Sequence, residues 1–149
     1  MISALEPFNF STTIQLRWKD IDQFGHVNNA VYLTYFETAR FYYNRDVNQW
    51  NWDEDQYIIA SVKVDYLRPL FYPGDIKVYL RTTEVGEKSF CFHYAITFMK
   101  NGVEKLAATG QSTQVFFDLK NQKTIPIPER IVKQWEAFEK KEYFEYKNA

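Results

Sequence analysis

Hydrophobic and polar positions alternate along several segments of the chain, which is the pattern of half-buried β-strands. The clearest case runs from Phe90 to Phe98, where aromatic or aliphatic residues occupy every second position. Asn101-Gly102 follows this segment and favours a two-residue hairpin turn, because both positions tolerate positive φ. The later strands should therefore form an antiparallel meander. The strands are expected over 12–18, 57–67, 76–81, 90–98 and 103–117.

Between the first two expected strands, the apolar residues change to helical spacing over 30–43. Asn28 is a good N-cap for this helix, since its side chain can accept a hydrogen bond from an N–H two or three residues on. The helix is apolar around so much of its circumference that other elements should enclose it. Residues 44–55 are rich in Asn and Asp and are expected to form an irregular connection. A short C-terminal helix should begin at Pro128-Glu129.

The order of elements is thus strand, helix, four strands and helix, which predicts an α+β domain whose sheet covers the central helix. The 149 residues are close to the usual size of one domain, and no internal repeat or linker interrupts them. We therefore expect one domain over 1–149.

Composition narrows the classes of partner. The formal charge of −1 gives no general attraction to nucleic acid or to an anionic membrane surface. The chain contains no stretch of roughly 18 consecutive apolar residues and no secretory signal, so we expect a cytoplasmic protein without membrane insertion. A single cysteine, Cys91, excludes an intrachain disulfide. Neither histidine has partners at metal-ligand spacing, so no metal site is expected.

The most informative segment joins the first strand to the helix. An acidic residue (Asp22), a glycine turn (Gly25) and an asparagine-capped helix start lie within eight positions. This arrangement can place a carboxylate beside the free N–H groups of a helix N-terminus. A carboxylate and a preorganised N–H donor are what the hydrolysis of an acyl group requires.

The segment 20–40 has the pattern D-x-D-x-x-G-H-V-N-N-x-x-Y-x-x-Y-x-E-x-A-R. It closely resembles the 4-hydroxybenzoyl-CoA thioesterase-like branch of the hotdog-fold superfamily, and the resemblance extends over about residues 10–140. The resemblance implies a curved antiparallel sheet wrapped round one long helix, assembled into homodimers or homotetramers with active sites at the subunit interface. It implies acyl-CoA thioester hydrolysis without metal or organic cofactor, coenzyme A being part of the substrate.

The resemblance also suggests catalytic roles. Asp22 matches the catalytic aspartate, which either attacks the thioester carbonyl or takes a proton from the attacking water. Asp20 is the competing carboxylate, to which the resemblance gives a structural role. Asn29 matches the position whose backbone N–H polarises the carbonyl. His26 could orient the carboxylate or the water, or it could shape the turn, and we favour the turn.

The expected substrate contacts are distributed along the chain. Gly25 permits backbone approach to the substrate. Side chains for the acyl group are expected, by resemblance, at Tyr32, Ser61, Val62 and Lys63. Lys88, with Ser89 in the same turn, is a candidate for the phosphates of coenzyme A.

Three alternatives stay open from sequence. An acyl-ACP thioesterase would require a basic patch at the pocket mouth, because carrier proteins are acidic. A hotdog dehydratase would normally pair a His with a carboxylate in motifs that this sequence lacks. A non-catalytic acyl-CoA binding module is the third, although retention of Asp22 argues against it.

Overall fold

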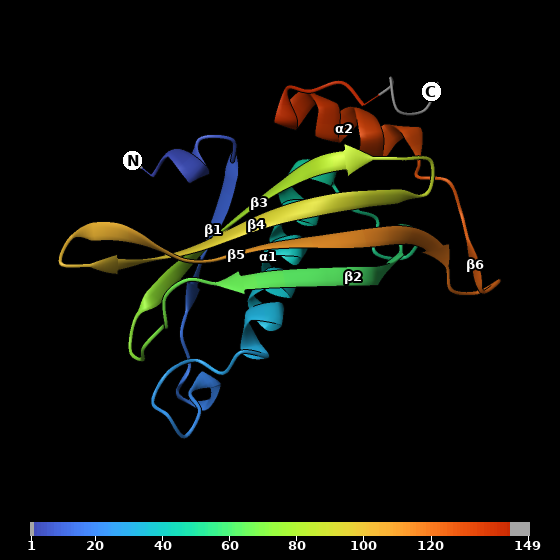
Figure 1. The fold of residues 1–149 in the computed structure, drawn as a ribbon. Coiled ribbons are helices and arrows are strands. Elements are labelled where there is room, and N and C mark those ends of the chain that lie inside the picture. The colour runs from blue at the N-terminus through green and yellow to red at the C-terminus, as the bar shows by residue number, and fades with distance from the viewer. Residues whose placement is uncertain (1, 144–149) are drawn as a thin grey trace.

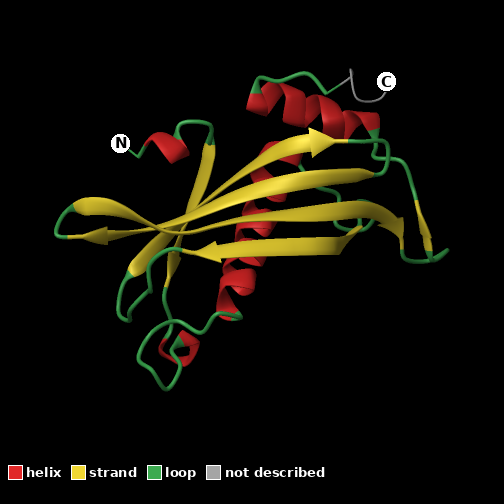
Figure 2. Ribbon diagram, viewed as in Figure 1, coloured by secondary structure: helices red, strands yellow, loops and turns green. Residues whose placement is uncertain are grey.

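The computed structural model describes residues 2–143 (Figure 1). A six-stranded antiparallel sheet curves across one long helix, and a shorter helix lies over one end of the sheet (Figure 2). This is the expected α+β hotdog architecture. The strands are β1 (Phe10–Gln15), β2 (Tyr57–Tyr66), β3 (Asp75–Val85), β4 (Ser89–Lys100), β5 (Val103–Asp118) and the two-residue β6 (Lys123–Thr124). The α-helices are α1 (Val31–Asn48) and α2 (Glu129–Glu139), and the short 3₁₀ helices are Ser3–Leu5 and Trp18–Asp20.

The strand order is β1-β3-β4-β5-β2, with β6 added to β5. The expected meander is confirmed in β3, β4 and β5, which pair with their sequence neighbours. Strand β2 pairs with β5 and forms one edge of the sheet among the described residues. The outer edge of β2 therefore presents backbone groups without a strand partner.

The core lies between the sheet and α1. The helix approaches the sheet so closely that a Cβ at Gly110 would stand 2.6 Å from the ring of Phe36. Phe36 in turn stacks on Tyr94 of β4, with ring centroids 4.1 Å apart. Helix α2 closes the end of the core with Trp135, which is fully buried against Phe90. No helix among residues 2–143 is both long enough and apolar enough to cross a membrane.

The first strand was predicted with the wrong bounds. It begins at Phe10 and ends at Gln15, whereas the sequence pattern extended it to Trp18. Trp18 instead begins a 3₁₀ helix, because the carboxylate of Asp20 accepts hydrogen bonds from the backbone N–H and side chain of Arg17. These contacts turn the chain away from the sheet.

The central helix is longer than predicted. It continues through residues 44–48, which were expected to be irregular, and it ends where Gln49 adopts a left-handed conformation. Asn44 and Asn48 extend the buried face of the helix at i, i+4 spacing. Their amide nitrogens donate hydrogen bonds, from Asn44 to the hydroxyl of Tyr57 and from Asn48 to the carbonyl of Ile131, while both amide oxygens are buried without a partner among the described residues.

Candidate active site

The loop between β1 and α1 folds into a compact turn at the N-terminal end of the helix (Figure 1). The backbone N–H of Asp22 donates to the carbonyl of His26 at 3.0 Å, and the N–H of Gly25 donates to the carbonyl of Asp22 at 3.1 Å. Gly25 has φ = 88°, a conformation that residues with a Cβ rarely adopt. The expected glycine turn is thus present, and it brings the motif residues 22–26 together.

The carboxylate of Asp22 is held in place but not neutralised. Its Oδ1 accepts a hydrogen bond of 2.8 Å from the backbone N–H of Phe24. Its Oδ2 lies 3.8 Å from Nδ1 of His26, which is longer than a hydrogen bond. The side chain of Asp22 is 20% exposed, so a water molecule or a substrate carbonyl has access to it. This geometry suits a nucleophile or a general base.

The neighbouring carboxylate has a different environment. Asp20 is 1% exposed and receives the guanidinium of Arg17 at 2.8 Å and the hydroxyl of Tyr35 at 2.8 Å. Burial opposes the charge of Asp20, but the hydrogen bonds from Arg17 and Tyr35 outweigh this and lower its pKa. All of its contacts stabilise the loop, so the structural role expected for Asp20 fits its surroundings.

The hydrogen bond expected at Asn28 is present, but Asn28 is not the N-cap of α1. Its side chain accepts a hydrogen bond of 2.9 Å from the N–H of Ala30. The helix begins at Val31, so Ala30 is the N-cap, and Ala30 makes no side-chain capping hydrogen bond. The N–H of Asn29 has no hydrogen-bond acceptor among the described residues. The carbonyl of Asn29 accepts from the hydroxyl of Tyr66 at 2.8 Å, which ties this peptide to the end of β2. Asn29 precedes the N-cap Ala30, so its free N–H belongs to the turn that leads into α1. A preorganised N–H without an acceptor is a suitable donor for a developing oxyanion.

Two hollows lie between α1 and β2. One has a volume of about 230 Å³ and is lined by His26, Asn29, Tyr32, Tyr66 and neighbouring residues. The other has a volume of about 190 Å³ and lies between Leu33, Glu37 and Arg40 of α1 and Ile59 and Val62 of β2. The predicted residues His26, Asn29 and Tyr32 line the first hollow, and Val62 lines the second. We call the two hollows together the groove.

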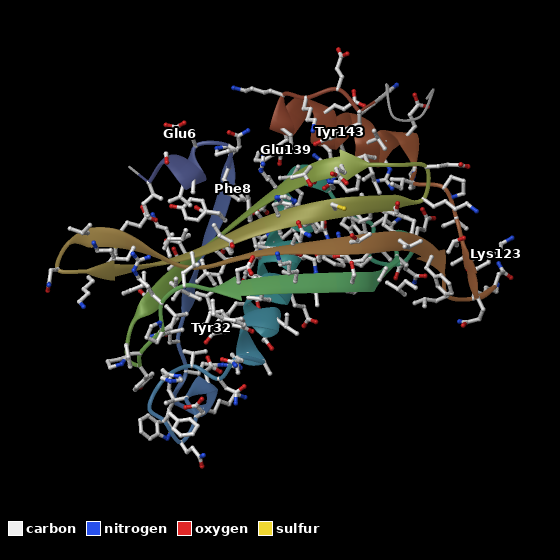
Figure 3. All side chains as sticks on the ribbon, viewed as in Figure 1. Glu6, Phe8, Tyr32, Lys123, Glu139 and Tyr143 are labelled. Atoms are coloured by element: carbon white, nitrogen blue, oxygen red, sulfur yellow. The ribbon has the colours of Figure 1, made fainter. Side chains whose placement is uncertain are left out.

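Tyr32, which is labelled in Figure 3, lines the hollow at Asn29. It is 2% exposed, and its ring meets the ring of Tyr66 edge-on at 4.8 Å. Burial, together with Tyr66, raises the pKa of Tyr32 to about 12, so the phenol is neutral near pH 7. It can offer a hydroxyl and an aromatic surface to a ligand, but not a negative charge.

The remaining expected contacts are not brought to this groove within one chain. Lys63 lines a separate hollow on the opposite face of the sheet, and Ser61, two residues earlier in β2, shares the face of Lys63. Ser89 of β4 pairs with Val115 of β5, which pairs with Ile58 near the start of β2. The hydroxyl of Tyr66, at the other end of β2, is hydrogen-bonded to Asn29.

Lys88 precedes Ser89, and it lies 3.5 Å from the hydroxyl of Thr124. Ile58 and Tyr66 are eight residues apart in β2, about 26 Å along an extended strand. One chain therefore separates the Lys88-Ser89 turn from Asp22.

Sequence reasoning missed Tyr66 and Arg68, which both line the hollow at Asn29. Tyr66 falls at an alternate position to Val62 and Val64 in β2, so the period-two pattern placed it on the same face of the strand. That signal did not reveal that its hydroxyl reaches the carbonyl of Asn29, because the contact joins residues 37 positions apart.

Comparison with known proteins identifies the family. The model of the thioesterase-like superfamily matches residues 16–135. The long-chain acyl-CoA thioesterase FadM of Escherichia coli (strain K12) is 29% identical over 119 residues, which are 78% of this chain and 89% of FadM. The uncharacterized protein YsmA of Bacillus subtilis (strain 168) is 32% identical over 88 residues, 58% of this chain, and the match spans 60% of the length of YsmA.

A solved structure extends the likeness over nearly the whole fold. The thioesterase of Thermus thermophilus, complexed with coenzyme A and Zn, is 32% identical, with a TM-score of 0.78 over 91% of this chain and 98% of that chain. The chain therefore belongs to the thioesterase-like superfamily, a family of thioester hydrolases with the hotdog fold.

Proposed function

We propose that this protein hydrolyses the thioester of an acyl-CoA to a free acid and coenzyme A. The observation that carries the proposal is the pairing of a partly exposed, ordered carboxylate, Asp22, with the acceptor-free N–H of Asn29 on one loop. Family membership supplies independent support, and FadM is named for the hydrolysis of long-chain acyl-CoA.

Each residue of the site has a definite task in this proposal. The N–H of Asn29 polarises the thioester carbonyl and stabilises the oxyanion that forms on it. Asp22 attacks the carbonyl carbon or removes a proton from the attacking water. His26, 3.8 Å from Asp22, stacks against Phe24 and helps to fix the turn. The reaction requires neither a metal ion nor an organic cofactor.

The acyl group occupies the groove between α1 and β2. Its walls combine apolar surface from Leu33, Ile59 and Val62 with the rings of Tyr32 and Tyr66. Gly25, at the tip of the loop, carries no side chain that would obstruct the approach of the thioester.

A second copy of the chain completes the site. Three apolar residues of the unpaired edge strand are 41–43% exposed, namely Ile58, Ile59 and Val62. Exposed apolar residues on an unpaired strand edge favour association with another chain. Antiparallel pairing of β2 with its twofold-related copy covers this edge. A twofold axis near Val62 sets Ile58 of one copy opposite Tyr66 of the other, and so brings Lys88 and Ser89 of the partner subunit toward the catalytic loop.

This arrangement gives the expected phosphate contacts a role. Lys88 and Ser89 of one subunit bind the phosphates of a coenzyme A whose thioester lies at Asp22 of the other subunit. The assembly is a homodimer built on β2, and a homotetramer is a pair of such dimers.

The proposal is tested by a thiol-release assay over short-chain, long-chain and aromatic acyl-CoAs, with and without EDTA. We expect turnover that survives EDTA and disappears in the Asp22→Asn variant. The chain-length profile then identifies the acyl preference. Turnover only on acyl-carrier protein would assign an acyl-ACP thioesterase instead. Tight acyl-CoA binding without turnover on any thioester would assign a binding module.

A further inference from the structure

A row of polar side chains crosses the outer face of the sheet, opposite the face that packs on α1. Arg81 of β3 is directly paired with His93 of β4, which is paired with Gln111 of β5, which is paired with Lys63 of β2. Their sequence neighbours Leu80, Thr82, Phe92 and Tyr94 are buried, so the row points away from the core. None of the four belongs to the groove described above.

The row borders a hollow of about 300 Å³, which we call the outer pocket. Ala95 and Thr109 line it at the next register position, where their small side chains leave space on the sheet. The N-terminal segment forms a wall with Ala4, Pro7 and Phe8, and Phe8 lies beside β3 in Figure 3. The volume is at the small end of the range found for ligand pockets in proteins.

The two cations of the outer pocket have different partners. Lys63 is compensated by Asp65, which lies 3.5 Å away. Arg81 contacts the ring of Phe8 at 5.5 Å, and its charge acts on the carboxylate of Glu139, but among residues 2–143 it makes no ion pair within 4 Å. The Nε of Arg81 is buried and has no hydrogen-bond acceptor among the described residues. A buried donor on a cation without an acceptor is costly unless a ligand supplies one.

His93 adds hydrogen-bonding capacity rather than charge. Burial, with Arg81 nearby, lowers the pKa of His93 below its usual value, so the ring is neutral near pH 7. The outer pocket thus presents one positive charge without a direct ion pair, neutral donors on His93 and Gln111, and an apolar wall at Phe8.

We propose that the outer pocket is a second ligand site that binds a small monocarboxylate with an apolar body. The carboxylate accepts hydrogen bonds from the planar fork of Arg81, the geometry that guanidinium and carboxylate groups share. The apolar body lies against Phe8 and Ala4 on the floor formed by Ala95. A single unpaired cation favours a monoanion over phosphate, because Asp65 repels a second negative charge.

The site is independent of the proposed active site. Lys63 and Val62 are adjacent in β2, so their side chains point to opposite faces of the sheet. Arg81 and His93 belong to strands that lie between β1 and β5, away from the catalytic loop. Occupation of the outer pocket therefore does not require the hydrolytic reaction.

The two histidines of the chain provide a direct test, because His26 lies at the active site and His93 at the outer pocket. The histidine ring signals of the full chain are followed by NMR during titration with sodium benzoate, and the His26→Gln variant assigns them. We expect a saturable shift of the His93 signal with a millimolar Kd. Benzamide, which has the same ring without the charge, should leave the His93 signal unchanged.

Two substitutions test whether Arg81 binds the carboxylate of benzoate. Arg81→Gln should weaken benzoate binding at His93 at least about tenfold, because a hydrogen-bonded charge is lost. Lys77→Gln removes an exposed cation from the same strand outside the pocket and should leave binding unchanged. An unaltered His26 signal in both variants verifies that the fold is intact.

Three results would overturn the proposal. The first is a His93 signal that does not shift saturably with benzoate. The second is binding that persists in the Arg81→Gln variant. The third is inorganic phosphate binding as tightly as benzoate, which would reject a monocarboxylate as the ligand.

Discussion

Two carboxylates, Asp20 and Asp22, lie two residues apart and are predicted to have separable roles. Asp20 is buried and fully hydrogen-bonded, while Asp22 is partly exposed and has one backbone donor. We therefore expect Asp20→Asn to reduce stability with little effect on the chemistry of the folded protein. We expect Asp22→Asn to abolish most turnover with little effect on stability.

The stability expected to be lost in Asp20→Asn follows from the contacts of Asp20. It accepts from the backbone N–H, Nε and Nη2 of Arg17 and from the hydroxyl of Tyr35, at 2.8–3.1 Å. An amide in its place turns one oxygen into a donor, so at least two of these donors lose their acceptor. Each hydrogen bond to a charged group contributes about 1.5–3 kcal/mol. Half of the Arg17 side chain is exposed, which reduces its share, and we expect a loss of about 3 kcal/mol. For a chain of this length the Tm then falls by about 6–12 °C.

The effect of Asp20→Asn also depends on pH. The pKa of Asp20 is lowered in the folded state, so its carboxylate stabilises the fold above the unfolded pKa of about 3.9. This stabilisation is lost as the pH falls through the folded pKa. The difference in the free energy of unfolding between wild type and Asp20→Asn should therefore be constant near neutral pH and shrink below about pH 4.

The main effect expected of Asp22→Asn is on kcat, not on stability. An asparagine Oδ1 can still accept the 2.8 Å hydrogen bond from the N–H of Phe24, so the turn is retained. The negative charge and the basic oxygen are lost, which for a general base costs about 10²–10⁴ in kcat. The stability change should stay within about 0.5 kcal/mol, because the side chain is partly exposed and leaves no buried donor unpaired.

The assay measures kcat on the best acyl-CoA and urea unfolding for wild type and both variants under the same buffer conditions. Loss of activity in Asp20→Asn at temperatures where it is folded, or a retained kcat in Asp22→Asn, would refute the separate roles of the two carboxylates. A large stability loss in Asp22→Asn would contradict the description of its environment.

Two further predictions follow from the assembly and from the packing. Mixing the Asp22→Asn variant with the Lys88→Gln variant, at subsaturating acyl-CoA, should restore activity. In a mixed dimer, one of the two sites has both residues intact. Mixtures no more active than the separate variants would place both residues in one subunit's site. Gly110→Ala should destabilise the fold by about 1–3 kcal/mol in urea unfolding, since its Cβ would lie 2.6 Å from Phe36. Gly86→Ala, whose Cβ would meet its nearest neighbours at 3.4 Å, is the matched control and should change stability less.

The loop between β1 and α1 was largely predictable because its signals are local. The turn at Gly25 and the hydrogen bond accepted by Asn28 depend on contacts within a few residues, and the structure contains both. The N-cap itself was predicted two residues too early, since α1 begins at Val31 after Ala30. The end of α1 was wrong because Asn44 and Asn48 look like loop residues in sequence. Their partners lie outside the helix, Tyr57 in β2 for Asn44 and Ile131 in α2 for Asn48, and these tertiary contacts let the asparagines continue a buried helical face.

The outer pocket was beyond prediction for a related reason. Arg81, His93, Gln111 and Lys63 come from four strands, and they align only through the pairing registers. Those registers shift at irregularities in each of the three pairings, and a one-residue shift moves a side chain to the other face. His93 acquires a proposed binding role only in this context.

Strand β2 contributes both to the proposed dimer interface and to the proposed active site. A long edge strand with exposed Ile58, Ile59 and Val62 is an aggregation hazard unless something covers it. In the proposed homodimer, pairing with a second copy satisfies the free backbone groups and buries these side chains in one step. The same proposed pairing joins the end of β2 that holds Asn29 through Tyr66 to the opposite end of the partner's strand. The proposed dimer thus explains both the exposed edge and the separation of Lys88 from Asp22 within one chain, and it predicts that hydrolysis depends on dimerisation.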